Sequence, residues 1–166
     1  NFSRQTFAAP DFVARCRNIL DGYSFPRELL IFELTESVSD KGFSAIRANM
    51  LALKEYGVRI ALDDFGEGFT SFADLQEYPV DGVKLDKRLV DNVLNQTGRS
   101  ILRAMIQVAH EMGLTILAEG VETKAQARAL QAMHCDVIQG FWFYAPLPRE
   151  EVKDKLTRQV PLAAPQ

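Results

Sequence analysis

The sequence has few of the residues that mark specialised classes of protein. Its 166 residues include only two cysteines, Cys16 and Cys135, too few for a disulfide framework or a thiolate metal site. We expect both to be free core thiols in a reducing compartment. Basic residues are not in excess, since 19 Lys and Arg stand against 22 Asp and Glu, with a net charge of −3. The lack of a basic patch argues against a nucleic-acid polymer as partner.

Long apolar runs are also lacking, and no signal peptide is recognisable, so we expect a cytoplasmic domain, whether or not its parent protein is anchored in a membrane. Hydrophobic residues make up 47% and charged residues 25%, as in ordinary globular proteins. We expect one domain over residues 1–160 and a frayed tail over residues 161–166. The sequence opens at Asn1 without a methionine, so we expect it to begin inside a longer protein or to lack its upstream part.

What the sequence does contain is a set of apolar segments that each end on a polar or charged side chain. Buried parallel strands read as nearly continuous apolar runs, and a carboxylate in such a run is costly to bury unless it is paired or binds a metal. The repeated arrangement predicts a site assembled from strand ends, as in barrel enzymes. The five segments are Leu30–Glu33, Arg59–Asp64, Gly82–Asp86, Thr115–Glu119 and Val137–Gln139.

Helical patterns alternate with these segments, which predicts βα units and a parallel sheet. Counting the Asn1 end, six strand ends are visible, so we expect an α/β fold, a modified TIM-like (β/α)8 barrel with about six of its eight βα units present. An open doubly wound sheet is the alternative, but its ligands gather at one switch point. The helical patterns cover Pro10–Leu20, Gly42–Tyr56, Ser71–Gln76, Gly98–Met112, Thr123–Met133 and Glu150–Arg158. Their apolar faces, which include Ile19 and Ile101, are expected to face the core. Thr123 and Gln126 form a capping-box signature.

The acidic strand ends predict a site for divalent metal ions. Glu33, Asp63, Asp64 and Glu119 offer hard oxygen ligands that suit Mg²⁺ or Mn²⁺ better than Zn²⁺, and Asn1 adds a neutral carbonyl. We expect adjacent aspartates to point in different directions, so that together they hold or bridge two ions, the usual clamp for phosphoryl displacement.

Lys84 ends a neighbouring strand, where it could orient or deprotonate a metal-bound water or stabilise developing charge. From the chemistry alone we expect metal-assisted hydrolysis of a phosphate ester. Proton abstraction from a carbon acid, as in enolase-like barrels, remains an alternative because it also uses carboxylates and a lysine.

The ordered motifs resemble the successive signatures of the EAL domain, the bacterial cyclic-di-GMP phosphodiesterase family. The resemblance extends from Asn1 to about Pro148 in the family's order, and it is the ordered set that is specific. The motifs are Asn1-Phe-Ser3, Glu33-Leu-Thr-Glu36-Ser, Leu62-Asp63-Asp64-Phe-Gly66, Val83-Lys84-Leu-Asp86, Ala118-Glu119-Gly-Val-Glu122-Thr, and Gln139-Gly140 with Pro146-Leu-Pro148.

The resemblance implies hydrolysis of cyclic di-GMP to linear pGpG with two Mg²⁺ or Mn²⁺ ions. Positions matching Asn1, Glu33, Asp63 and Glu119 bind one metal in the family, and the position of Asp63 is shared with a second metal that Asp64 also holds. The position of Lys84 contacts the catalytic water. Among the supporting positions, Glu36 matches the glutamate that steadies the loop after the aspartates. Glu122 and Gln139 match positions near the metal-bound water and the substrate. Asp86 is either a substrate contact or a helix N-cap.

The resemblance also implies a homodimer, and sensory or GGDEF-type domains in a parent protein that controls biofilm formation or motility. Two features depart from the family pattern: the Glu-Ala-Leu signature would lie before Asn1, and Glu67 replaces a small residue or Thr. A catalytically inactive cyclic-di-GMP receptor or docking module is therefore the alternative function, and a different Mg-dependent barrel is a third.

Several other polar and aromatic residues are expected to be structural. His110 and His134 lack metal-ligand spacing, and Asp81 reads as a turn or capping residue. The aromatic run Phe141–Tyr144 is expected to pack in the core, although one ring could stack on a guanine base.

Overall fold

The computed structural model describes residues 1–35, 43–66 and 72–157. The helices of this part are α1 Arg4–Phe7, α2 Phe12–Leu20, α3 Phe43–Glu55, α4 Phe72–Glu77, α5 Lys87–Asp91, α6 Gln96–Glu111, α7 Lys124–Gln131 and α8 Arg149–Thr157, with a 3-10 turn, η1, at Arg27–Leu29. The strands are β1 Ile31–Thr35, β2 Arg59–Phe65, β3 Gly82–Leu85, β4 Thr115–Ala118 and β5 Val137–Ile138. Within these ranges, no helix is long and apolar enough to span a membrane.

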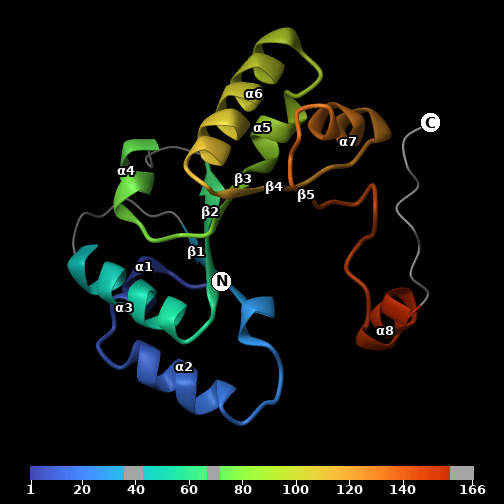
Figure 1. Ribbon diagram of the computed structural model, residues 1–166. Coiled ribbons are helices and arrows are strands. Elements are labelled where there is room, and N and C mark those ends of the chain that lie inside the picture. Colours follow the sequence, from blue (N-terminus) through green and yellow to red (C-terminus); the bar gives the residue numbers. More distant parts are fainter. Residues whose placement is uncertain (36–42, 67–71, 158–166) are drawn as a thin grey trace.

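The strands form one parallel sheet in the order β1-β2-β3-β4-β5, so sequence neighbours are also neighbours in space (Figure 1). On the free side of β1, Phe2 makes a parallel bridge with Leu34. The Asn1 end therefore takes the sixth strand position that the sequence predicts. Strand follows helix along the whole sheet, which is the arrangement of a partial (β/α)8 barrel.

Local sequence signals explain where several helices begin and end. Thr123 and Gln126 form the predicted capping box at the start of α7. Gly57 and Gly113 follow α3 and α6 with φ of 95° and 74°, the left-handed conformation that glycine tolerates. The sequence reasoning missed α1 and α5, each of which begins after a polar cap, Ser3 and Asp86. Both helices are about one turn long, too short for a helical period to be read.

The core lies between one face of the sheet, which we call the outer face, and the helices that cover it. The strands contribute Phe32, Leu34, Ile60, Leu62, Val83, Leu85, Ile116 and Ala118, none more than 7% exposed. Ile46, Met50 and Leu53 of α3 and Leu102, Ile106 and Ala109 of α6 complete this core. The opposite face, the inner face, carries the polar strand ends.

A cluster of phenylalanines fixes the start of the chain against β1. The ring of Phe2 lies 5.1 Å from that of Phe12 and 4.9 Å from that of Phe32, centroid to centroid. The backbone N–H of Phe2 donates to Glu33 O at 2.8 Å, and Thr35 N–H donates to Phe2 O at 3.0 Å. These contacts place Asn1 beside Glu33.

Some of the predicted core residues lie at the surface. Ile19 is 64% exposed and Ile101 is 49% exposed, because each turns to the side of its helix away from the sheet. The prediction that the aromatic run Phe141–Tyr144 packs in the core is also wrong, since all four rings are exposed. These residues follow β5, which is the edge strand of the described sheet. The predicted tail, residues 161–166, lies outside the described residues.

Both cysteines are free, as expected. Cys16 is buried and Cys135 is partly buried. Burial raises the pKa of the Cys135 thiol to about 11, so it is protonated at neutral pH.

Candidate metal centre

Four side chains from the inner face converge on one point at the carboxyl edge of the sheet. The ammonium of Lys84 on β3 donates to Glu33 Oε2 at 2.8 Å, and its nitrogen lies 2.8 Å from Asp63 Oδ1 and 2.7 Å from Glu119 Oε1. Glu33 comes from β1, Asp63 from β2, and Glu119 directly follows β4. Lys84 and Asp63 are buried, at 6% and 7% exposure, so the paired charges are largely withdrawn from water.

The pKa of Lys84 is raised above the ordinary value for a lysine. Burial by itself lowers it, but the hydrogen bonds to Asp63, Glu119 and Glu33 outweigh burial because they favour the charged form. Lys84 is therefore an ammonium at neutral pH. In this arrangement it donates hydrogen bonds to the three carboxylates and carries a positive charge.

An irregularity in β2 brings the two adjacent aspartates together. Successive residues of a regular strand point to opposite faces. Between Leu62 and Phe65, however, the register with β3 shifts, and Asp64 has a φ of 55°. Its backbone N–H donates to Asp63 Oδ1 at 3.2 Å. Left-handed backbone is uncommon outside glycine, although Asp tolerates it better than most residues, and such conformations gather at functional sites.

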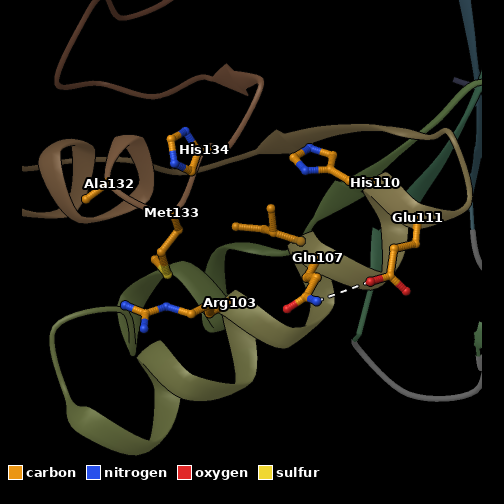
Figure 2. A pocket seen from close by; sticks show the side chains of 8 residues that line it. Arg103, Gln107, His110, Glu111, Ala132, Met133 and His134 are labelled. Atoms are coloured by element: carbon orange, nitrogen blue, oxygen red, sulfur yellow. Dashed lines mark hydrogen bonds between the residues drawn. The ribbon is translucent and has the colours of Figure 1, made fainter.

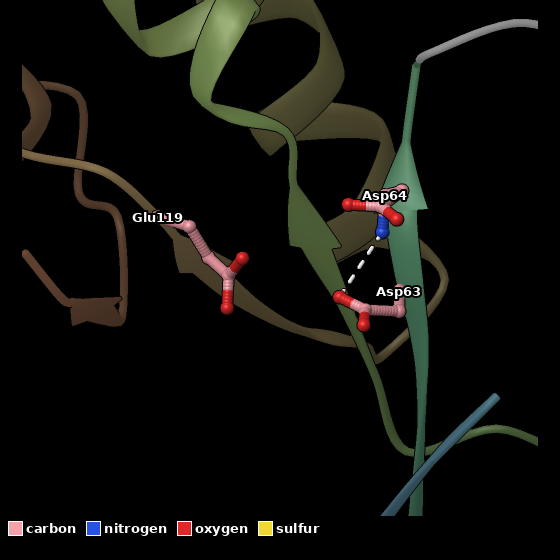
Figure 3. Close-up of side chains that lie close together, drawn as sticks. All are labelled: Asp63, Asp64 and Glu119. Atoms are coloured by element: carbon pink, nitrogen blue, oxygen red, sulfur yellow. Dashed lines mark hydrogen bonds between the residues drawn. The ribbon is translucent and has the colours of Figure 1, made fainter. Parts of the chain in front are cut away.

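As a result, one carboxylate oxygen of Asp63, one of Asp64 and one of Glu119 lie within 4.8 Å of one another (Figure 3). In Figure 3, Glu119 extends from the segment after β4 toward the two aspartates on β2. We expected Asp63 and Asp64 to point in different directions, and the bulge instead gives them oxygens that one ion could share.

Asn1 completes the group from the other side of β1. With its amide nitrogen facing the carboxylates, Asn1 donates to Glu33 Oε2 and, at 3.3 Å, to Asp63 Oδ2. With the amide turned over, its oxygen faces the same two carboxylates, an arrangement that is repulsive unless a cation lies between them. The side chain of Asn1 is thus placed to offer either a hydrogen bond or a metal ligand.

The set of donors fits a divalent metal ion. It consists of carboxylate and amide oxygens, the hard ligands that Mg²⁺ and Mn²⁺ prefer. The Lys84 ammonium shows that Glu33, Asp63 and Glu119 are already arranged around a positive charge. Carboxylates this close together require such a charge, because their mutual repulsion is strong in a poorly solvated site.

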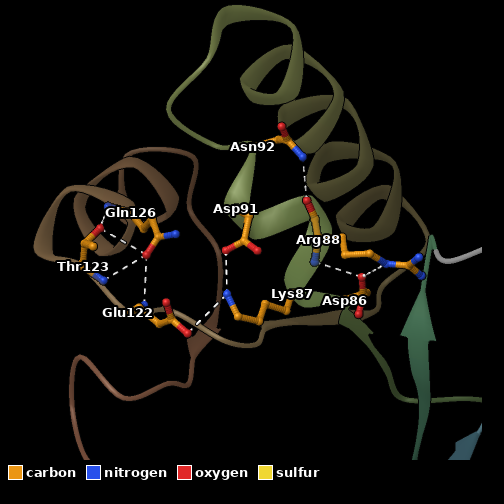
Figure 4. Close-up of polar contacts among 8 residues, drawn as sticks. All are labelled: Asp86, Lys87, Arg88, Asp91, Asn92, Glu122, Thr123 and Gln126. Atoms are coloured by element: carbon orange, nitrogen blue, oxygen red, sulfur yellow. Dashed lines mark hydrogen bonds and ion pairs between the residues drawn. The ribbon is translucent and has the colours of Figure 1, made fainter.

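Two of the predicted supporting residues, Asp86 and Glu122, belong to a second polar cluster (Figure 4). Asp86 caps α5 by accepting from the N–H of Arg88 at 2.9 Å, so the helix-cap reading is confirmed. Glu122 is exposed and pairs with Lys87, whose ammonium lies 3.3 Å from Glu122 Oε1 and 2.7 Å from Asp91 Oδ1. Figure 4 shows Lys87 reaching between these two carboxylates.

Of the remaining predicted residues, the structure describes Gln139. The side chain of Gln139 is exposed, and its backbone bridges the ends of β4 and β5, donating to Ala118 O at 2.8 Å and accepting from Val121 N–H at 3.1 Å. Glu36 and Glu67 lie outside the described residues.

Sequence reasoning did not single out Lys87, which fixes the segment after Glu119. A Cβ at Gly120 would lie 2.5 Å from Lys87 Cγ, and Gly120 has a φ of 67°, so this position admits only glycine without strain. The Glu119-Gly120 pair at a strand end was the available signal, but the contact with Lys87 depends on the path of α5.

Comparison with known proteins identifies the family. The family model described as EAL domain matches residues 1–146. Among curated proteins, the chain is 33% identical over 160 residues to the signaling protein YkoW of Bacillus subtilis, covering 96% of the chain and 20% of YkoW. The chain thus spans about a fifth of the length of this relative.

Solved structures agree in fold. The PaMucR phosphodiesterase in its c-di-GMP complex is 33% identical, with a TM-score of 0.82 over 92% of the chain and 62% of that protein. The manganese/cy-diGMP complex of BlrP1 from Klebsiella pneumoniae is 28% identical, with a TM-score of 0.75 over 82% of the chain and 35% of that protein. The predicted α/β, TIM-like barrel class is therefore confirmed. With the match to the family model over nearly all of its length, the chain belongs to the EAL domain family.

Proposed function

We propose that this chain carries the metal centre of a phosphodiesterase that hydrolyses cyclic di-GMP to linear pGpG. The observation that carries the proposal is the convergence of Glu33, Asp63 and Glu119 on a single cation position. Surface carboxylates have no reason to gather in this way, whereas a metal-binding site requires it. The c-di-GMP complexes of PaMucR and BlrP1 support the choice of substrate.

The geometry supports the following choice of metal-holding residues. Asn1, Glu33, Asp63 and Glu119 would hold one Mg²⁺ or Mn²⁺, and Asp63 and Asp64 would hold a second. Such a pair of ions would supply an activated water and would neutralise charge on the phosphodiester. The manganese complex of BlrP1 supports this choice of metal.

Lys84 is the residue to which we assign the catalytic role. As an ammonium on the inner face, it can donate a hydrogen bond to the attacking water or to a phosphate oxygen and offset the charge that develops there. Its three carboxylate partners hold its position, so the donor is oriented before the substrate arrives.

Supporting roles are proposed for the residues at the rim. Glu122, steadied by Lys87, and Glu36 would order the segments beside the metals, and Gln139 and Asp86 would contact the substrate. Asp86 can do so while capping α5, because a carboxylate has acceptor capacity for both.

The biological setting is proposed from the family. We infer that the chain works in the cytoplasm, as a homodimer, within a bacterial protein that carries sensory or GGDEF-type domains and that controls biofilm formation or motility. The length of YkoW, of which this chain covers 20%, supports attached domains.

The proposal is tested by incubating cyclic di-GMP with Mn²⁺ and the protein and separating the nucleotides by chromatography. Because the chain covers 62% of the PaMucR structure, it is assayed alone and fused to the PaMucR segment that it leaves uncovered. We expect pGpG to form in the fusion, to require metal and to disappear in Asp63→Asn. Binding of cyclic di-GMP without turnover would instead establish the receptor function, and neither binding nor turnover would refute both.

A further inference from the structure

Two carboxylates at the amino edge of the sheet are held in the same way. Asp81, just before β3, accepts from Ile60 N–H of β2 at 2.8 Å and from the Lys54 ammonium of α3 at 2.6 Å. We call these three groups the β2 clamp. Lys54 lies at the end of a helix, Ile60 lies in the strand that follows this helix, and Asp81 lies just before the next strand.

The same geometry recurs two βα units later. Asp136, just before β5, accepts from Ile116 N–H of β4 at 2.8 Å, and its Oδ2 lies 2.9 Å from His110 Nε2 of α6. We call these groups the β4 clamp. A single carboxylate again ties a helix end to two strands.

The sequence carries this repeat as a fixed spacing. Lys54 and Gly57 are three residues apart, as are His110 and Gly113, and both glycines end their helices in the left-handed conformation. The helix ends close identically, since Gly57 N–H donates to Lys54 O and Gly113 N–H to His110 O, each at 2.9 Å. The repeat therefore places the two cationic positions equivalently.

Each clamp lies directly upstream of the candidate metal centre. Ile60 precedes Asp63 by three residues, and Ile116 precedes Glu119 by three residues. In a parallel sheet, whatever fixes the start of a short strand also fixes where its last side chains lie. At the other end of β4, the Glu119 N–H donates to Leu85 O at 3.3 Å, which makes this amide a reporter of the strand end.

The two clamps differ in the residue that supplies the cation. Lysine keeps its charge throughout the physiological range, whereas histidine changes charge between about pH 5 and 8. Burial raises the pKa of Asp136, but the hydrogen bonds from Ile116 N–H and His110 outweigh burial and lower it, so this carboxylate is ionised at neutral pH.

The other charged groups around His110 are few and exposed. Arg103 and Glu111 of α6, with His134 after α7, line a cavity of about 460 Å³ that also includes His110 (Figure 2). In Figure 2, Glu111 is turned toward Gln107, which donates to it at 3.1 Å. Asp136 is therefore the charged partner that contacts the His110 ring.

We propose that Asp136 is a positioning residue for Glu119 and that His110 makes this positioning depend on pH. Protonated His110 forms a charge-assisted hydrogen bond with Asp136, which is stronger than the neutral one. The β4 clamp is then tighter when His110 is charged than when it is neutral, while the β2 clamp keeps the charge of Lys54. The link to metal binding rests on the proposed function of Glu119.

The test compares variants with the wild type at pH 6.0 and at pH 8.0. His110→Gln keeps a hydrogen-bond donor but removes the charge, His110→Lys makes the charge permanent, and Lys54→Gln is the matched change in the β2 clamp. Amide hydrogen exchange at Glu119, measured without metal, reports how well the carboxyl end of β4 is protected. Titration calorimetry with Mn²⁺ reports the affinity of the candidate metal centre. Each result is a ratio to wild type at the same pH, so intrinsic effects of pH cancel.

We expect His110→Gln to lower the protection of the Glu119 amide and the affinity for Mn²⁺, each about threefold at pH 6.0. At pH 8.0 each should fall by less than about 1.5-fold. These values are in line with a partly exposed ion pair. His110→Lys should match the wild type at pH 6.0 and exceed it at pH 8.0. Lys54→Gln should act equally at both values. An equal effect of His110→Gln at the two pH values would overturn the proposal, as would a loss of protection confined to Ile116.

The two readouts separate this inference from the proposed function. If the exchange results hold but the wild type does not bind Mn²⁺, the clamp stands and the metal centre is wrong. If Mn²⁺ binds but protection of Glu119 is the same in every His110 variant, the metal centre stands and the clamp is wrong.

Discussion

The two faces of the sheet are built from alternate residues of the same strands, yet they have different roles. On the outer face, Leu34, Ile60 and Leu85 are fully buried beneath the helices. On the inner face, Ile31 and Val137 are 50% and 43% exposed. The inner face instead holds Lys84 and its carboxylates at one edge. Among the described residues, the outer face thus supplies most of the packing and the inner face carries the charged cluster.

Below Lys84, the inner face forms a cavity of about 410 Å³. Its lining includes Ile31, Ala61, Lys84 and Leu117, which come from β1 to β4. Arg59 and Asp81 also line this cavity, but Lys84 itself is only 6% exposed, and this burial strengthens its ion pairs. The difference between the faces is therefore also what keeps the charges of the candidate site tightly coupled.

The largest expected effect comes from truncating matched leucines on the two faces. Leu62→Ala on the outer face should lower the free energy of unfolding by about 3 kcal/mol, since it leaves a cavity in a packed core. Leu117→Ala on the inner face should lower it by about 1 kcal/mol, because that side chain is only partly buried. Urea denaturation measures both values, and equal losses would remove the distinction between the faces.

The inner face should show the opposite balance between stability and binding. Asp63→Asn should weaken Mn²⁺ binding at least about 100-fold, since it removes a carboxylate ligand, while the free energy of unfolding changes by less than about 1 kcal/mol. Titration calorimetry and urea denaturation measure the two effects. Asp11→Asn, the same change at an exposed position in a surface ion pair, is the control and should alter neither. A variant that unfolds as it loses metal would assign Asp63 to the structure instead.

A smaller effect is expected from pH acting on Lys84. Because its pKa is raised in the folded state, its ion pairs contribute stability that is complete below the ordinary lysine pKa of about 10.4 and is lost as the pH rises through the folded value. The wild type should lose on the order of 1 kcal/mol more than Lys84→Met between pH 9 and pH 11.5. Parallel curves of thermal midpoint against pH for the two proteins would contradict this.

The smallest effect extends the comparison from sheet faces to helix faces. Ile101→Ser on the exposed side of α6 should change the free energy of unfolding by less than about 0.5 kcal/mol. The neighbouring Leu102 is fully buried, so Leu102→Ser serves as the positive control and should lower the free energy of unfolding about as much as Leu62→Ala does. Thermal denaturation of the pair checks which side of α6 packs, and a large loss at Ile101 would mean that this face is covered in solution.

The candidate site was predictable from the sequence because its ligands end apolar runs. Glu33, Asp63, Lys84 and Glu119 are each at or next to the end of a parallel strand, and such strands direct their carboxyl ends to the same edge. The helix ends at Gly57 and Gly113 were equally readable, since glycine in the left-handed conformation is a local requirement. Where a single local rule decides the structure, the sequence was sufficient.

Exposure could not be predicted in the same way. Ile19, Ile101 and the aromatic run Phe141–Tyr144 were expected inside, and the structure leaves them exposed. Burial depends on which neighbours arrive from elsewhere in the chain, and periodicity in one helix contains no information about them. The turn of Asp64 toward Asp63 was hidden for a related reason, since it requires a register shift between β2 and β3.

The sequence by itself thus determined the order of strands and helices, the family, and the residue types available for metal, because all of these are written in local patterns. Only the tertiary structure decided that the Lys84 ammonium lies among three carboxylates, and that Asp81 and Asp136 tie helix ends to strands. These contacts join residues 20 to 51 positions apart, as in the pairs Ile116–Asp136 and Glu33–Lys84. Their distances are set by the packing of the whole sheet against its helices.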